Sequence, residues 1–126
     1  MRLLLDTHVF LWWLADDRRL GQASRKAIAD AKSLVHVSAV TVWELAIKAS
    51  LGRIDLGGAD LANEIPANGF IELPIVAQHA LVAGSLPRHH HDPFDRMLIA
   101  QAQVEGLQVV THDKVFQKYG VPVMVT

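Results

Sequence analysis

Short apolar runs alternate with segments of helical periodicity along the whole chain, and this alternation restricts the possible folds more than any other feature. The runs are rich in Leu, Val and Ile and lie at residues 2–5, 34–38, 70–75, 107–111 and 121–125. Largely apolar strands are typical of parallel sheets whose two faces are both covered. Helices are predicted between and after them, at residues 8–15, 22–32, 41–52, 58–69, 76–86, 93–105 and 114–120. We therefore expect one α/β domain over residues 1–126, with a mostly parallel sheet and no internal repeat or linker.

The segment "HHHDPFDRMLIAQA" predicts a helix with an acid on its buried side. Asp92 is the expected N-cap, Pro93 suits the first helical position, and Gly106 ends the helix. Asp95 then heads an apolar stripe formed by Leu98, Ile99 and Ala102. A carboxylate facing the core is costly unless it is paired or binds a metal ion, so Asp95 calls for a functional explanation.

Acids from four separate places in the sequence converge on one edge of the expected sheet. Asp6 and Asp113 follow the carboxyl ends of apolar strands, which is the edge where open α/β sheets bind ligands. Asp95 opens a helix at that edge, and Glu44 is expected on the first turn of the helix after the second strand.

Such a group of carboxylates needs bound protons or cations. Two carboxylates about 5 Å apart repel each other by roughly 3 kcal/mol at an effective dielectric constant near 20. Oxygen ligands without Cys, and without His at metal-binding spacing, favour Mg²⁺ or Mn²⁺ over zinc. Such an ion would lower the pKa of a water and neutralise a leaving oxygen. The residues thus indicate a metal-assisted phosphodiesterase, and a phosphatase acting on a small phosphate ester is the alternative.

Composition limits the other classes of function. Of the 126 residues, 51% are hydrophobic. The 12 Lys and Arg nearly balance the 13 Asp and Glu, so the chain lacks the strong overall positive charge that is typical of nucleic-acid-binding proteins. The absence of Cys excludes disulfides and thiol catalysis and fits a reducing cytoplasm. The apolar start is split by Asp6 and His8 and is too short to span a bilayer. We expect a soluble, cytoplasmic protein.

Four strings of the sequence together resemble the PIN-domain ribonucleases, in particular the VapC-type toxins of bacterial toxin–antitoxin pairs. The strings are "LLLDTHVFLWWL", "SAVTVWELAIKASLGRI", "HHHDPFDRMLIAQA" and "VVTHD". The resemblance covers nearly the whole chain and implies a PIN-like three-layer fold, with a five-stranded sheet ordered 3-2-1-4-5 between helices.

The same resemblance implies Mg²⁺- or Mn²⁺-dependent endonucleolytic cleavage of RNA. It assigns Asp6 as the central metal ligand, Glu44 and Asp95 as further ligands, and Asp113 as the acid that completes the site. It also implies a homodimer and a cognate VapB-type antitoxin.

Each acid also has a plainer interpretation. Glu44 could form an exposed helix pair with Lys48, Asp6 could be a turn residue, and Asp113 could cap the helix that begins at Lys114. We favour the metal site, with Thr7 orienting Asp6 or a water and Lys48 buffering the acids.

The sequence leaves the roles of several neighbouring residues open. Arg96 suits a phosphate or carboxylate partner as well as it suits the surface. The run from His89 to His91 is interpreted as a polar loop rather than a zinc site, with RNA contact as the alternative.

Two further groups of residues indicate surfaces. One of Trp12 and Trp13 is expected in the core, and the other apolar residues of that helix suggest a dimer or antitoxin surface. The basic cluster is expected to be solvated or to contact RNA phosphates, and its members are Arg18, Arg19, Arg25 and Lys26.

Two other functions remain open at this point. One is a Mg²⁺-dependent phosphatase with Asp6 as its nucleophile. The other is a non-catalytic module whose acid-lined groove binds a partner protein.

Overall fold

The five strands form one wholly parallel sheet. The computed structural model describes residues 1–126, and the strand order is β3-β2-β1-β4-β5. All four neighbouring pairs are parallel, which confirms the expected order and makes the sheet parallel throughout rather than mostly so. The strands are β1 (Arg2–Leu5), β2 (Leu34–Ser38), β3 (Ile71–Leu73), β4 (Gln108–Thr111) and β5 (Val123–Val125).

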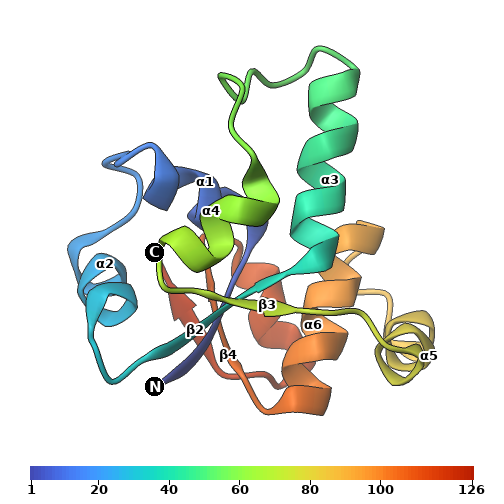
Figure 1. The fold of residues 1–126 in the computed structure, drawn as a ribbon. Helices are drawn as coiled ribbons and strands as arrows, with labels where there is room; N and C mark the ends of the chain where they lie inside the picture. The colour runs from blue at the N-terminus through green and yellow to red at the C-terminus, as the bar shows by residue number, and fades with distance from the viewer.

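Helices connect successive strands and cover both faces of the sheet (Figure 1). They are α1 (Thr7–Leu14), α2 (Gln22–Ala29), α3 (Ala39–Ser50), α4 (Leu61–Ala67), α5 (Ala77–Ser85), α6 (Pro93–Glu105) and the 3₁₀ helix η1 (Lys114–Tyr119). Helix α2 is shorter than expected because Asp30 leaves the helical conformation with ψ 125°. Helix α6 has the predicted bounds, with Gly106 in the left-handed conformation at φ 67°. No helix is both long and apolar enough to cross a bilayer.

Alternate residues of the central strand β1 enter two separate cores. Leu3 and Leu5 pack in one apolar cluster with residues of α1, α2 and α4. Leu4 packs in the other cluster, with residues of α6 and η1. The three consecutive leucines of β1 are explained by this arrangement, because a parallel strand between two helical layers buries side chains on both of its faces.

Helix α3 contacts both layers, since it lies against α1 and α6 (Figure 1). Its buried residues are Val40, Thr41, Glu44 and Leu45. The hydrophobic spacing of the sequence predicts an apolar face made of Val42, Leu45, Ala46 and Ala49, but Ala46 is exposed. Tertiary packing has turned the helix so that the carboxylate of Glu44 points inward.

Strand β1 has β2 on one side and β4 on the other, so the strand order reverses beside it. The crevice at such a point lies at the carboxyl ends of the strands. Asp6 immediately follows β1 and Asp113 lies just beyond β4, at this crevice.

Candidate active site

Asp6 is the most deeply enclosed acid at the crevice. Its Oδ1 accepts a hydrogen bond from the Val9 N–H (2.8 Å), so Asp6 caps α1, and its Oδ2 accepts one from the Thr111 hydroxyl. The residue is 3% exposed, and desolvation raises the pKa of its carboxyl, although these two donors act in the opposite direction. The carboxylate is therefore held rigidly in an environment that penalises its charge.

Glu44 is also buried, and donors hold both of its oxygens. Thr7 Oγ1 donates to Glu44 Oε1 (2.7 Å), and Lys48 Nζ lies 2.7 Å from Oε2. Glu44 lies on the second turn of α3 rather than the first, because α3 begins at Ala39. Thr7 orients Glu44 and not Asp6, which corrects the expectation from the sequence. The helix pair with Lys48 exists, but it is partly buried rather than exposed.

Asp95 and Asp113 meet at the imidazole of His90. His90 Nε2 lies 2.9 Å from Asp95 Oδ2 and 3.0 Å from Asp113 Oδ2. Asp92 caps α6 through the N–H groups of Phe94 and Asp95, as predicted. Asp113 caps η1 through the Val115 N–H while its other oxygen faces His90, so capping and a place in the site coexist.

The charges of these acids act on Asp95. Burial raises the pKa of the Asp95 carboxyl to about 8, and the neighbouring charges of Asp92, Asp6, Glu44 and Asp113 add to the effect. The four predicted site residues are thus close enough to influence one another. A cluster of this kind takes up either a proton or a cation at neutral pH.

His90 is the residue that reasoning from the sequence missed. The run His89–His91 does form a loop, but only His90 turns inward, with a side chain that is 16% exposed. His90, Asp95 and Asp113 each offer one ligand atom, and these atoms lie within 4.8 Å of one another. Three consecutive loop residues cannot easily all face one metal ion, which is why the sequence predicted a polar loop. That reasoning does not apply to His90 alone.

Arg96 has a structural position that neither expectation described. Its guanidinium is buried and donates to the carbonyl oxygens of Ala83, Leu86, Pro87 and His90 at 2.9 to 3.2 Å. These oxygens belong to the end of α5 and to the histidine loop. Arg96 therefore ties this loop to α6, and it is mostly shielded from solvent and forms no ion pair with a carboxylate.

The rim beside Asp6 carries aromatic and imidazole rings. His112 Nδ1 lies 3.9 Å from Asp6 Oδ2, and the His112 ring is 4.8 Å from that of His8 and 5.2 Å from that of Trp12. Arg19 lies over the Trp12 ring at 5.3 Å. The exposed rings of His8 and His112 and the guanidinium of Arg19 thus extend from the acids toward the loop before α2.

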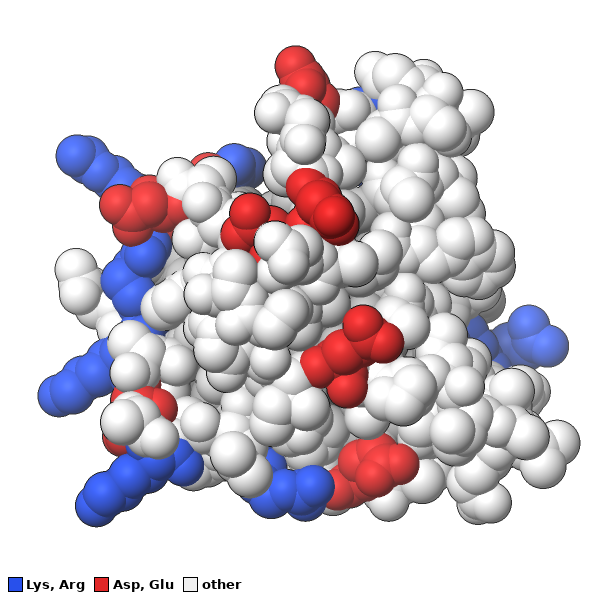
Figure 2. All heavy atoms as spheres, viewed as in Figure 1, with Lys and Arg blue, Asp and Glu red and all other residues white.

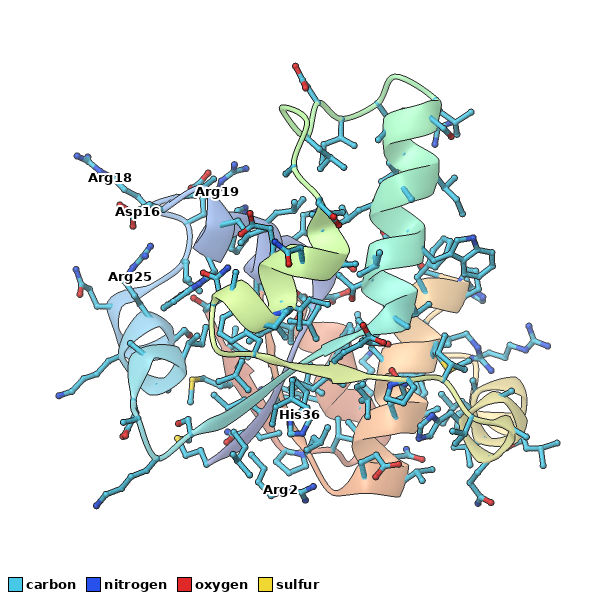
Figure 3. The ribbon with its side chains drawn as sticks, viewed as in Figure 1. Arg2, Asp16, Arg18, Arg19, Arg25 and His36 are labelled. Carbon is cyan, nitrogen blue, oxygen red and sulfur yellow. The ribbon has the colours of Figure 1, made fainter.

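Much of the basic cluster is neutralised within the chain. Lys and Arg gather along one side of the molecule in Figure 2, and Figure 3 places Arg18, Arg19 and Arg25 around the loop before α2. Arg19 pairs with Asp17 and Arg25 with Asp16, each at 2.7 Å. The pairing with Arg19 lowers the pKa of the Asp17 carboxyl to about 2.

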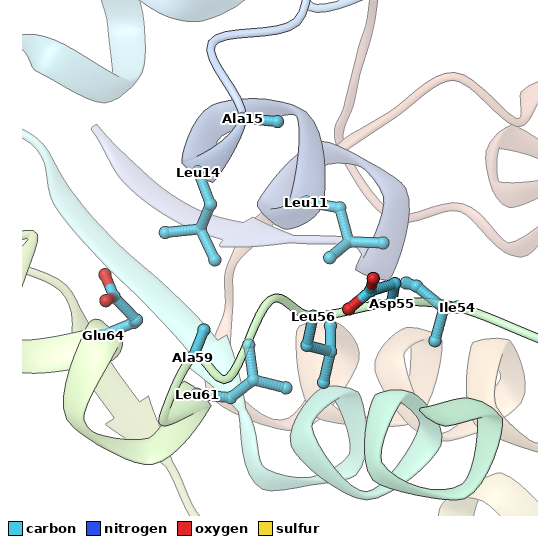
Figure 4. A pocket seen from close by; sticks show the side chains of 9 residues that line it. All are labelled: Leu11, Leu14, Ala15, Ile54, Asp55, Leu56, Ala59, Leu61 and Glu64. Atoms are coloured by element: carbon cyan, nitrogen blue, oxygen red, sulfur yellow. The ribbon is translucent and has the colours of Figure 1, made fainter. Parts of the chain in front are cut away.

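Apolar surface is found at several places on the molecule. A cavity of about 300 Å³ is open between α1 and the segment before α4, with Leu11, Leu14, Ile54 and Leu56 among its walls (Figure 4). Trp12 is buried, as expected for one of the two tryptophans, while Trp13, Leu11 and Leu14 are partly buried, and the Trp13 indole donates to Asn68. The largest exposed apolar side chains lie elsewhere, at Trp43, Leu51 and Leu81.

The chain matches a known family and solved structures over nearly its full length. The PIN-domain family model matches residues 3–122. Ribonuclease VapC22 of Mycobacterium tuberculosis is 34% identical over 130 aligned residues, which cover 98% of this chain and 96% of that protein.

Two of the similar solved structures come from complexes. The VapBC2 structure from Rickettsia felis, bound to a promoter DNA fragment, has a TM-score of 0.69 at 12% identity and covers 99% of this chain and 98% of that one. The VapBC-1 structure from nontypeable Haemophilus influenzae has a TM-score of 0.69 at 18% identity, with the same coverage. At these identities the structures establish the fold.

Proposed function

Because this chain belongs to the PIN-domain family and, within it, to the VapC ribonucleases, we propose that it is a metal-dependent endoribonuclease that acts as the toxin of a toxin–antitoxin pair. The observation that carries the proposal is the group of four acids at the carboxyl edge of the sheet. Burial raises the pKa of Asp95 to about 8, and the charges of the other three acids add to the effect. A protein has little reason to bury mutually repelling carboxylates unless a cation binds them.

The donor set fits a hard divalent cation. Asp6, Glu44, Asp95 and Asp113 offer carboxylate oxygens, which Mg²⁺ and Mn²⁺ prefer, and we assign these residues as the ones that hold the ion. When bound, the ion supplies positive charge that stabilises the phosphodiester transition state and acidifies water. Mg²⁺ is the proposed physiological ion, and Mn²⁺ is expected to replace it.

The residues of the chain contribute orientation. Thr111 and the Val9 N–H fix the Asp6 carboxylate, while Thr7 and Lys48 fix that of Glu44. Groups held in place before substrate arrives need no reorganisation during the reaction, which is the main means by which enzymes stabilise developing charge. The RNA backbone would approach over the open rim, where His8 and His112 are exposed.

Two protein partners are part of the proposal. A VapB-type antitoxin would cover the acids and silence the nuclease, and the similar solved structures are VapBC structures. A homodimer would cover exposed apolar side chains such as Trp43, Leu51 and Leu81.

An RNA cleavage assay tests the activity. Wild type and Asp95→Asn, both purified free of antitoxin, are incubated with mixed transfer and ribosomal RNA in Mg²⁺, Mn²⁺ or EDTA. We expect discrete fragments from wild type with either metal, and none in EDTA or from the variant. Fragments from Asp95→Asn at the wild-type rate would remove Asp95 from the site. No cleavage with any metal would overturn the nuclease.

The two rival functions give different results. A phosphatase would form a phosphoenzyme at Asp6, but this residue is 3% exposed and both of its oxygens accept hydrogen bonds, which disfavours a nucleophile. A non-catalytic module would show no stabilisation by metal ions. Trapping with a small phosphate ester and thermal unfolding in Mg²⁺ test these two alternatives.

A further inference from the structure

The loop that carries His90 is fixed through two backbone groups of this residue, its N–H and its carbonyl oxygen. The His90 N–H donates to the Tyr119 hydroxyl (2.7 Å), which in turn donates to the Pro87 carbonyl oxygen (2.8 Å). The His90 carbonyl oxygen accepts from Arg96 Nη1 (3.2 Å). Loops usually place their side chains loosely, whereas contacts from η1 and α6 hold this one at a defined position.

The imidazole ring is fixed as well. Its edge-to-face contact with the buried ring of Phe116 has a centroid distance of 6.0 Å and an interplanar angle of 83°. The Asp92 N–H lies 3.2 Å from His90 Nδ1 and donates to it. With Nδ1 accepting a hydrogen bond, the ring proton of the neutral imidazole must be on Nε2.

An imidazole in this tautomer is a donor at the acids and not a ligand. Nε2–H donates to Asp113 Oδ2 (3.0 Å) and lies 2.9 Å from Asp95 Oδ2. A nitrogen that carries a proton has no free lone pair for a metal ion. The distances alone would allow His90 to be either a metal ligand or a hydrogen-bond donor to the acids. The hydrogen bond that Nδ1 accepts favours the donor.

We propose that His90 is a positioning residue that holds the carboxylates of Asp95 and Asp113 together through Nε2–H, so that they are arranged to receive a divalent cation. The two acids come from different elements, the first turn of α6 and the residue before η1. A donor that both carboxylates contact fixes the position of one relative to the other. Removal of groups that orient metal ligands typically weakens metal binding by about 10- to 100-fold. The inference rests on the proposed metal site but not on RNA being the substrate.

Three variants separate positioning from ligation. His90→Ala removes the donor, and His90→Gln keeps an N–H donor near the position of Nε2 while offering no imidazole. His91→Ala is the matched control, because His91 is the exposed neighbour in the same run. Circular dichroism establishes that each variant is folded before metal is added.

Calorimetric titration with Mg²⁺ and Mn²⁺ gives the first readout. We expect His90→Ala to weaken the binding of Mg²⁺ and of Mn²⁺ by about tenfold or more, and by similar factors for the two ions. We expect His90→Gln to remain within about threefold of wild type, and His91→Ala to match wild type. Unchanged affinity in a folded His90→Ala protein would overturn the proposal, and so would equal losses in the Ala and Gln variants.

Spectroscopy gives the second readout, which does not depend on activity. Nitrogen NMR of the ring in metal-free protein should show His90 protonated at Nε2 only. Electron spin echo modulation of bound Mn²⁺ should show no directly coordinated imidazole nitrogen. Such coordination in wild type, lost in His90→Ala, would make His90 a ligand and reject the positioning role. An absence of RNA cleavage alongside the expected metal results would refute the nuclease and leave the role of His90 standing.

Discussion

Replacing Asp95 by Asn should stabilise the metal-free protein, and the gain should grow with pH. Burial and neighbouring charge raise the pKa of Asp95 from 3.8 to about 8. In the unfolded chain the group ionises near its ordinary pKa, so the folded state binds this proton more tightly. The resulting contribution to stability is complete below about pH 4 and is lost as the pH rises toward 8.

The size of the effect follows from the shift. Roughly four pKa units at about 1.4 kcal/mol each give an upper limit of 5 to 6 kcal/mol. The Asp95 side chain is 23% exposed, and solvent reaching it reduces this limit. About half of the limit, spread over the titration, leaves about 2 kcal/mol lost between pH 5 and pH 8. Asn has the shape of the protonated carboxyl and does not titrate, so the variant avoids this loss.

Urea unfolding in EDTA, followed by circular dichroism at pH 5, 6, 7 and 8, measures the effect. The free energy of unfolding of Asp95→Asn minus that of wild type should increase by about 2 kcal/mol over this range. Asp30→Asn, at an exposed position, is measured over the same pH range as the control for the substitution itself. Parallel curves for wild type and Asp95→Asn would refute the reasoning, because they would mean that Asp95 ionises normally in the folded protein.

Three further perturbations test other parts of the structure. Arg96→Lys should lower the free energy of unfolding by about 2 to 4 kcal/mol in urea titrations, because an ammonium group cannot reach four carbonyl oxygens. A loss below about 0.5 kcal/mol would mean that Arg96 does not hold the histidine loop against α6. Thr111→Val should weaken calorimetric Mg²⁺ binding about tenfold while the fold survives, since it removes the donor to Asp6; unchanged affinity would show that Thr111 does not orient the acid. Saturating Mg²⁺ should raise the Tm of wild type and leave that of Asp6→Asn nearly unchanged; equal shifts in both would place the ion elsewhere.

Local sequence signals were sufficient to locate the strands and the boundaries of α6. The boundaries of α6 follow from Asp92, Pro93 and Gly106, because helix capping and backbone conformation depend on adjacent residues. Strand order came from the resemblance to a known family and is confirmed by the sheet. The carboxyl-edge positions of Asp6 and Asp113 follow from parallel strands alone.

The partners of each acid were decided only by the tertiary structure. Thr111 is 105 residues from Asp6, Thr7 is 37 residues from Glu44, and His90 is 23 residues from Asp113. Spacing along a chain says which residues share a helix face or a strand, but it does not say which hydroxyl or imidazole will point at a distant carboxylate.

The histidine loop is the clearest example. His89, His90 and His91 are chemically identical, and no pattern in the sequence distinguishes the one that turns inward. The choice is made by Tyr119 and Arg96, which hold the backbone of His90 from η1 and α6. The sequence by itself determined where acids and strands lie along the chain, whereas packing of those elements selected the donor that holds the acids together, because only packing brings their side chains within hydrogen-bond distance.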